Sequence, residues 1–317
     1  MDDLTDRLVL GTMYFGTRTD EATSRALLDR FVEAGGRTLD TANCYAFWAS
    51  ETGAGGQSES TIGAWLADNP GIRTELEIAS KVGQEPLSPG VFLPPWEGLG
   101  RRVIERECRR SLDRLGIDSL DVYWAHGEDR SVDLAEVVAT FGELVDEGVV
   151  GSLGLSNHPT WRVERARSLA HAAGTEPFTA LQLTTSYLQP RPGVEVPGKD
   201  HRFGFVVDET WDYLVENPEV ELWVYSPLLH GAYDRDDRPL PEVYDHPGTT
   251  RRLTVLGEVA GEVGATRGQV VLAWLLHRGS QVRPIIGASS VAQLDEALAA
   301  SRINLSPEQM SRLDTAC

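Results

Sequence analysis

Three residues that could exchange protons each stand at the end of a short apolar segment. Asp40 ends RTLD, Lys81 ends ELEIASK and His126 ends LDVYWAH. Tyr45 lies five residues past Asp40, within reach of the same place. A buried lysine is costly unless a counter-charge accompanies it, and Lys81 is one of only two lysines in the chain. We therefore expect Lys81 and Asp40 to form an ion pair.

Together these four residues could transfer a proton to a substrate oxygen. A free tyrosine, with a pKa of about 10, is too weak an acid near neutral pH, but an adjacent ammonium group such as that of Lys81 lowers this pKa. His126 could hydrogen-bond the substrate oxygen, and general acid catalysis of this kind is worth about 10² to 10⁴ in rate. The set supplies no nucleophile or electrophile, so a cofactor is expected. The alternative interpretation is a structural Lys–Asp pair beside an ordinary histidine and tyrosine.

The elements that must position these residues are strands that alternate with helical patterns. Eight apolar runs are continuous, as expected of strands buried on both faces: 8–10, 38–40, 76–82, 120–126, 149–156, 180–185, 222–225 and 284–286. Alternation with helices indicates right-handed βαβ units and a parallel sheet. The predicted fold class is therefore α/β, a (β/α)8 TIM barrel that forms a single domain over residues 1–317. A doubly wound open sheet is the competing fold, but no GxGxxG follows the first strand.

Helix signals and loop composition support this alternation. Residues 134–145 have apolar positions at i, i+3, i+4 and i+7, with Gly148 just past the end, and Thr266 begins a capping-box pattern. Two long segments, 46–56 and 189–205, are rich in Gly, Pro and polar residues and are predicted to be loops. Both follow predicted strands, and in a barrel the loops after the strands carry the active site.

The composition excludes several classes of function. Lys+Arg is 29 and Asp+Glu is 48, so the net charge of −19 argues against nucleic-acid or anionic-membrane partners. No run of about 18 apolar residues could span a bilayer, and the acidic start lacks the basic region of a signal peptide. The cysteines 44, 108 and 317 form no CxxC, so we expect no disulfide framework, no metal site and a cytoplasmic location. Segment 193–199, GVEVPGK, has the spacing of a phosphate-binding loop but lacks the following Ser or Thr.

A series of motifs along nearly the whole chain resembles those of the aldo-keto reductase family. In family order they are LGTMYFG (10–16), LDTANCY (39–45), SESTIG (58–63), ASK (79–81), LDVYWAH (120–126), GSLGLSN (151–157), LQ (181–182), YSPL (225–228) and IIGASS (285–290). One such motif would be weak support, whereas the ordered series is specific. The resemblance implies a barrel enzyme that binds NADP(H) without a Rossmann motif and reduces an aldehyde or ketone to an alcohol.

By this resemblance, the catalytic residues are Asp40, Tyr45, Lys81 and His126. Tyr45 would protonate the carbonyl oxygen while the nicotinamide delivers hydride to the carbonyl carbon. Lys81 and Asp40 would tune Tyr45, and His126 would orient the carbonyl. The implied substrate-binding residues are Tyr14, Phe47, Trp48, Trp96 and His126.

The resemblance also implies a set of cofactor-binding residues. They are Thr12, Met13, Asp40, Ser156, Asn157, Gln182, Tyr225, Ser226, Pro227, Leu228, Gly231, Gly287, Ser289, Gln293 and Glu296. Thr12 and Met13 would touch the ribose, and Tyr225 would stack on the nicotinamide. The nicotinamide carboxamide would be held by Ser156, Asn157 and Gln182. Those of 226–231 would pass under the pyrophosphate, and those of 287–296 would surround the adenosine. The alternatives are a helix entry at Ser156 and Asn157 and a core amide at Gln182.

One departure from the family pattern concerns the cofactor. Many members carry Lys or Arg after the eighth strand to clamp the 2′-phosphate, but residues 288–297 contain neither. Arg283 precedes this predicted strand and should point to the other end of the barrel. NADP(H) is the expected cofactor, with NAD(H) use left open.

Two other functions compete with carbonyl reduction. One is a non-catalytic nicotinamide-binding module that senses redox state, and the other is an isomerase or aldolase with Lys81 as a Schiff base. The complete tetrad favours a reductase, because pairing with Asp40 would keep Lys81 charged rather than nucleophilic. The expected partner is a small carbonyl substrate: an aldehyde, a ketone, a keto-sugar or a biosynthetic intermediate. The protein itself is expected to be a monomer or a small homo-oligomer.

Overall fold

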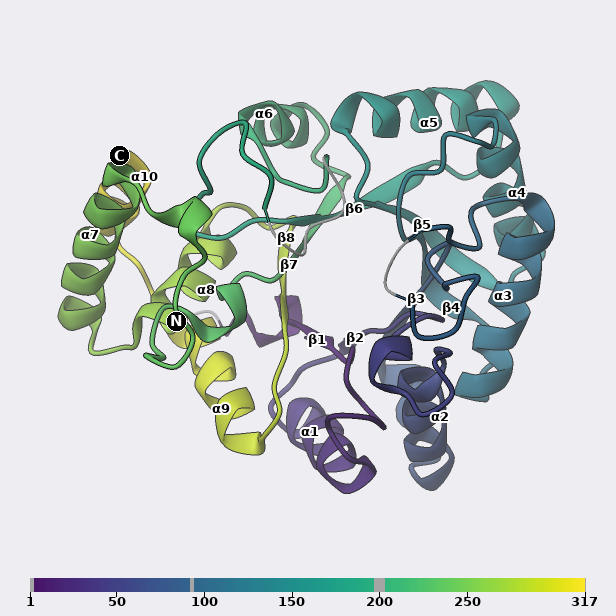
Figure 1. Ribbon diagram of the computed structural model, residues 1–317, viewed down its shortest axis with the longest axis horizontal. Coiled ribbons are helices and arrows are strands. Elements are labelled where there is room, and N and C mark those ends of the chain that lie inside the picture. Colours follow the sequence, from purple (N-terminus) through teal and green to yellow (C-terminus); the bar gives the residue numbers. More distant parts are fainter. Residues whose placement is uncertain (1–2, 92–93, 197–202, 317) are drawn as a thin grey trace.

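Eight parallel strands close into a barrel in sequence order, which confirms the predicted (β/α)8 fold (Figure 1). The computed structural model describes residues 3–91, 94–196 and 203–316. The strands are β1 (Val9–Gly11), β2 (Thr38–Asp40), β3 (Glu77–Val82), β4 (Leu120–Ala125), β5 (Val150–Ser156), β6 (Phe178–Thr184), β7 (Glu221–Tyr225) and β8 (Val282–Ile286). All eight predicted runs are strands, with ends that differ by at most two residues.

Helices form a ring outside the strands (Figure 1). They are α1 (Glu21–Glu33), α2 (Gln57–Asp68), α3 (Arg101–Leu115), α4 (Leu134–Asp146), α5 (Thr160–Ala173), α6 (Asp208–Glu216), α7 (Pro247–Val263), α8 (Arg267–His277), α9 (Val291–Ala299) and α10 (Pro307–Thr315). The predicted capping box at Thr266 is present at the start of α8. Within the described residues, no helix has the length and apolar character needed to cross a membrane.

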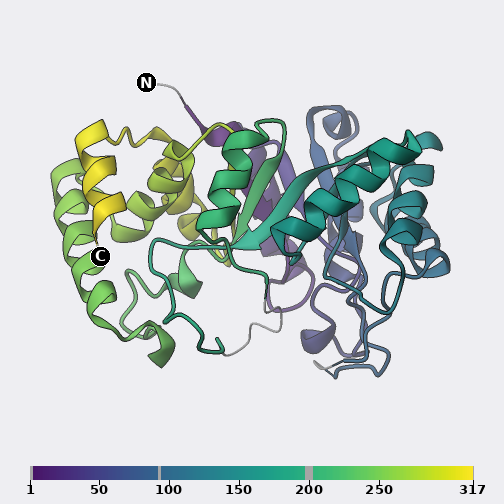
Figure 2. The same ribbon diagram turned by 90° about the horizontal axis from the view of Figure 1, so that it is seen from above.

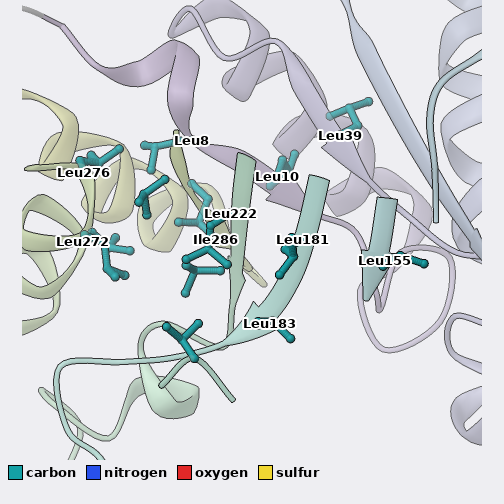
Figure 3. Close-up of a cluster of buried hydrophobic side chains, with 14 of the residues drawn as sticks. Leu8, Leu10, Leu39, Leu155, Leu181, Leu183, Leu222, Leu272, Leu276 and Ile286 are labelled. Atoms are coloured by element: carbon teal, nitrogen blue, oxygen red, sulfur yellow. The ribbon is translucent and has the colours of Figure 1, made fainter. Parts of the chain in front are cut away.

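Side chains on each strand alternate between two apolar layers. Leu39, Leu181 and Leu222 belong to the larger cluster between strands and helices, and Figure 3 shows part of this cluster, which includes Leu272 and Leu276 of α8. The residues between them along the strands form a separate small cluster inside the barrel: Val9, Ala79, Val122, Trp124, Ala180, Trp223 and Ile285. Since strand side chains have a period of two, residues 40, 81, 156, 182 and 225 point inward like Ala79, Ala180 and Trp223.

The interior layer is closely packed. The rings of Trp124 and Trp223 meet edge to face at 5.1 Å between centroids. Opposite Trp124, a Cβ at position 154 of β5 would lie 2.1 Å from the indole ring, so only glycine fits there. This packing fills the barrel below the inward-pointing polar residues and leaves them as the layer at its carboxyl end.

The amino end of the barrel is held by Arg283, which is 9% exposed. Its guanidinium is 2.7 Å from Glu77 on β3 and 3.1 Å from Glu221 on β7, and it also donates to Thr38 on β2. The expectation that Arg283 points away from the carboxyl end is therefore correct. The expectation that it precedes the strand is wrong, because it is the second residue of β8.

Long connections after the strands gather on one side of the barrel (Figure 2). The predicted loop 46–56 contains a short 3-10 helix, η2 (Phe47–Ala49), and is otherwise without regular structure up to Gly56. In the predicted loop 189–205, residues 197–202 lie outside the described part of the chain. They include the last three residues of segment 193–199. The described residues of this loop contain no helix, and Phe205 forms an isolated bridge with Thr184.

Candidate active site

Lys81 lies at the centre of a compact group at the carboxyl end of the barrel. Its Nζ donates hydrogen bonds to Asp40 Oδ2 at 2.6 Å, to the Thr41 carbonyl at 2.7 Å and to the Tyr45 hydroxyl at 2.7 Å. The Tyr45 hydroxyl lies 3.4 Å from Asp40 Oδ2. Lys81 is fully buried and Asp40 is 1% exposed, so this is a desolvated network rather than a surface ion pair.

The strand ends and one turn bring these groups together. Asp40 is the last residue of β2, and Lys81 is the last but one of the adjacent parallel strand β3. Both point inward, and Tyr45 returns to them through the turn that follows β2. That turn is fixed by a hydrogen bond from the Asn43 amide to the Lys81 carbonyl at 3.1 Å. His126 follows β4, and its ring lies edge-on to that of Tyr45 at 5.7 Å between centroids. All four predicted catalytic residues therefore occupy one place.

Five of the predicted cofactor residues lie close to this group. Gln182 Nε2 donates to Asp40 Oδ1 at 2.9 Å, so both oxygens of that carboxylate have a donor. Asn157 Nδ2 donates to the His126 carbonyl at 2.9 Å, and its Oδ1 accepts from the Tyr225 hydroxyl at 2.7 Å. The backbone of Asn157 is left-handed, with φ of 58°, a conformation that is uncommon outside glycine and tends to occur at functional sites. The structure thus brings the predicted carboxamide-binding residues beside His126.

Ser156 and Thr12 belong to the same frame. The Ser156 hydroxyl donates to the Gln182 carbonyl at 3.2 Å. Both the amide and the hydroxyl of Thr12 donate to the Asp40 carbonyl at 3.0 Å, and Thr12 is fully buried. Met13 follows it and is half-buried.

The remaining predicted cofactor residues form two segments farther along the rim. After β7, the segment from Ser226 to Gly231 has left-handed backbone at Ser226, Leu229, His230 and Gly231. After β8, Gly287 has open space where a Cβ would stand, and Ser289 donates from its amide and its hydroxyl to Gln293 Oε1. Glu296 accepts from Thr266 at 3.1 Å. Both segments follow barrel strands, so they lie at the same end of the barrel as the tetrad.

Four predicted substrate residues form an aromatic wall above the tetrad. This aromatic wall consists of Tyr14, Phe47, Trp48 and Trp96. Trp48 meets Tyr14 at 6.1 Å and Phe47 at 4.9 Å, both edge to face, and Phe47 lies 6.3 Å from Trp96. Phe47, Trp48 and Trp96 pack together with Tyr45 in one apolar cluster, so the wall adjoins the proposed acid directly.

Comparison with known proteins decides the family. The model of the aldo/keto reductase family matches residues 7–317. The chain belongs to the aldo/keto reductase family. It is 30% identical over 311 residues to an uncharacterized oxidoreductase, YrpG, of Bacillus subtilis, a match that covers 97% of this chain and 91% of that protein. It is 28% identical to the norsolorinic acid reductase stcV of Emericella nidulans, over 97% of this chain and 77% of that protein. Among solved structures, the thermostable aldo-keto reductase Tm1743 in complex with the inhibitor epalrestat matches with a TM-score of 0.73 and 27% identity, over 98% of this chain and 95% of that one.

Membership makes this chain an oxidoreductase of a family that acts on small carbonyl compounds with nicotinamide cofactors. In this family member, burial raises the pKa of the Tyr45 hydroxyl well above its usual value, and the charge of Asp40 acts in the same direction. Burial therefore outweighs any lowering of this pKa by the adjacent Lys81 ammonium group, and the net shift is upward. Burial also lowers the pKa of Lys81, against the opposing effect of Asp40. Tyr45 keeps its proton at neutral pH, which is the form that an acid needs.

Two buried carboxyl groups that the sequence did not single out support the aromatic wall. Glu97 Oε1 accepts from Asn43 Nδ2 at 2.8 Å and from the Gly83 amide at 2.9 Å. Glu85 Oε1 accepts from the Gly55 amide at 2.9 Å. The loops after β2 and β3 are therefore joined beside Tyr45 by two carboxyl groups. Their positions in irregular loops gave no periodic signal, and only the contact with Asn43 in the LDTANCY motif links Glu97 to the site.

Glu97 gives this aldo/keto reductase a specific pH dependence of stability. Burial raises its pKa from 4.5 to about 7, so folding favours the protonated carboxyl. The resulting stabilisation is complete below pH 4.5 and is lost as the pH rises through about 7. We expect the wild type to lose roughly 3 kcal/mol of unfolding free energy relative to Glu97→Gln between pH 4.5 and 8. Urea unfolding of both proteins at several pH values measures this, and parallel curves would contradict it.

Proposed function

We propose that this protein reduces an aldehyde or ketone to an alcohol by hydride transfer from NAD(P)H, and that Tyr45 is the general acid. We also propose that one domain, residues 1–317, carries the whole site. The observation that carries the proposal is the contact of Lys81 Nζ with both the Tyr45 hydroxyl and Asp40. A lysine committed to two such partners is placed to act on the tyrosine. A structural ion pair has no need of a third, phenolic partner.

The residues around the tetrad fit a nicotinamide. The amide groups of Asn157 and Gln182 and the hydroxyl of Ser156 offer the donors and acceptors that a carboxamide requires. The Tyr225 hydroxyl donates to Asn157 Oδ1 at 2.7 Å, so the aromatic ring of Tyr225 lies beside these groups and offers a face for stacking. When bound there, the reduced nicotinamide supplies the hydride that the side chains lack.

Each member of the tetrad then has a distinct task. Tyr45 holds the proton that passes to the carbonyl oxygen, and burial keeps that proton in place until charge develops on the substrate. Lys81 donates to the phenol oxygen, so it stabilises the phenolate that remains after transfer. Asp40, held by Gln182, keeps the ammonium group in position. His126 donates a hydrogen bond that orients the carbonyl oxygen toward Tyr45.

The aromatic wall points to an apolar carbonyl substrate. Its four rings offer large flat apolar surfaces, and the neighbouring residues of its cluster are Ala42 and Cys44. Aromatic rings prefer edge-to-face or offset contacts with other rings. We therefore propose an aryl or otherwise apolar aldehyde or ketone, rather than a phosphorylated sugar, as the substrate class.

Turnover with both cofactors tests this function. Purified protein is mixed with 4-nitrobenzaldehyde and either NADPH or NADH, and the absorbance of the reduced nicotinamide is followed. Consumption of the cofactor with formation of the alcohol supports the proposal. Cofactor binding without turnover on any apolar carbonyl would favour a redox-sensing module, and borohydride trapping of a carbonyl compound on Lys81 would favour Schiff-base chemistry.

The neutral loop after β8 governs the choice between NADPH and NADH. NADP(H) remains the proposed cofactor. We propose NAD(H) use alongside it, because Ser289 and Gln293 offer only uncharged groups to the 2′-phosphate that distinguishes NADP(H). Replacing Ser289 by Arg adds one charge-assisted contact at an exposed position, so we expect the ratio of kcat/KM for NADPH over NADH to rise about fivefold. Ser289→Gln, which has similar reach but no charge, should leave the ratio unchanged. An equal effect of both substitutions would place the phosphate elsewhere.

A further inference from the structure

The thiol of Cys44 lies against the imidazole of His126. Sγ is 3.5 Å from Nδ1, within hydrogen-bond range for sulfur. Cys44 directly precedes Tyr45, is 3% exposed, and packs with Ala42 and Phe47 at the base of the aromatic wall. Within the described residues, this sulfur has its hydrogen-bond contact with His126.

The direction of this hydrogen bond follows from the state of the thiol. Burial raises the pKa of Cys44 well above its usual value, and the nearby carboxyl groups of Glu85, Glu97 and Glu59 act in the same direction, against Lys81. Cys44 therefore keeps its proton. Sulfur is a weak acceptor, whereas an unprotonated imidazole nitrogen is a good one. The favourable arrangement has the thiol donating to Nδ1.

We propose that Cys44 is a positioning residue that fixes the tautomer of His126, with the thiol donating to Nδ1 and the imidazole proton on Nε2. A neutral imidazole carries one proton, so a donor at Nδ1 places that proton on the other nitrogen. His126 then presents an N–H donor rather than a lone pair. This inference rests on the proposed function, in which His126 donates to the carbonyl oxygen of the substrate.

The backbone around both residues is built to keep this contact. A Cβ on Gly55 would lie 2.4 Å from the Asn43 carbonyl oxygen and 2.5 Å from Cys44 Cα, so glycine packs directly behind the cysteine. The Gly55 amide is in turn held by Glu85. On the other side, the His126 amide donates to the Val82 carbonyl and its own carbonyl accepts from Asn157. The backbone of both residues is held by these contacts, so the sulfur and the imidazole ring meet in a defined geometry.

The tautomer can be measured directly on the full chain without cofactor or substrate. Long-range ¹H–¹⁵N correlation spectra distinguish a protonated from an unprotonated ring nitrogen, and His126→Asn identifies the signals among the seven histidines. We expect the wild type at neutral pH to show an unprotonated Nδ1 and a protonated Nε2. A protonated Nδ1 in the wild type would overturn the proposal, whatever the protein catalyses.

Two substitutions then connect the tautomer with catalysis. Cys44→Ala removes the donor, so we expect the His126 signals to move to averaged positions and kcat to fall about fivefold, the effect of one lost hydrogen bond. Cys44→Ser retains a donor and should keep the wild-type tautomer and kcat within about twofold. A loss of kcat in Cys44→Ala with the Nε2–H tautomer unchanged would show that the cysteine only fills space, and would overturn the proposal. If neither variant nor wild type turns over a carbonyl compound, the proposed function fails while the tautomer assignment is still decided by the spectra.

Discussion

The Tyr45→Phe variant is expected to lose about 10³-fold in kcat, because it lacks the hydroxyl proton that the proposed reaction transfers to the carbonyl oxygen. The substitution removes only the hydroxyl group of Tyr45, which accepts from Lys81. The aromatic ring remains, so its edge-to-face contact with His126 should be kept. Lys81 keeps Asp40 and the Thr41 carbonyl as acceptors. The fold should therefore lose only about 1 kcal/mol of unfolding free energy.

Cofactor affinity separates loss of the acid from loss of the site. Titration of tryptophan fluorescence with NADPH should give the same dissociation constant for Tyr45→Phe and the wild type within about twofold. Tyr213 provides a matched control, since its hydroxyl also donates to a carboxylate, Glu164 at 2.9 Å, but on the outer helices. Tyr213→Phe should retain wild-type kcat. Retained turnover in Tyr45→Phe would remove Tyr45 from the role of acid.

The Lys81→Met variant is expected to lose both activity and stability. Removing the ammonium group leaves Asp40 as a buried carboxylate without its counter-charge, which costs about 3 to 5 kcal/mol. Without the donor to the phenol oxygen, kcat should fall about 10²-fold or more. Urea unfolding and steady-state turnover measure the two effects separately.

A double variant shows which effect belongs to which interaction. Asp40→Asn combined with Lys81→Met removes both charges, so most of the lost unfolding free energy should return while kcat stays low. A double variant as unstable as Lys81→Met alone would mean that the ammonium group stabilises the fold through Tyr45 and the Thr41 carbonyl instead. Recovery of kcat in the double variant would contradict the role proposed for Lys81.

The barrel could be predicted from the sequence because its strands are buried on both faces. Such strands read as continuous apolar runs, and the polar residue that ends each run, such as Asp40 or Lys81, is conspicuous against that background. Parallel strands place their carboxyl ends at one rim, so the sequence alone predicts that the four residues of the tetrad, from three segments, lie close together. Gln182 and Tyr225 were expected near them only from the resemblance to the family motifs LQ and YSPL.

What the sequence could not supply was the balance of energies within the site. The effect of Lys81 on Tyr45 was inferred from charge alone, whereas the depth of burial, which raises the tyrosine pKa, depends on the packing of the aromatic wall. The contact of Cys44 with His126 joins residues 82 positions apart through loops of irregular course. Glu97 was missed for the same reason, because neither a period nor a motif marks a residue whose role is to receive donors from another loop.

Arg283 has a consequence for how the barrel comes apart. It stands on β8 and binds carboxylates on β3 and β7 together with the Thr38 hydroxyl on β2, so it joins strands from both halves of the sequence across the barrel axis. Any partly unfolded state that separates the first four strands from the last four takes carboxylate or hydroxyl partners away from the buried guanidinium of Arg283, which is a costly state. Half-barrel intermediates are therefore disfavoured, and we expect the two halves to unfold as one cooperative unit.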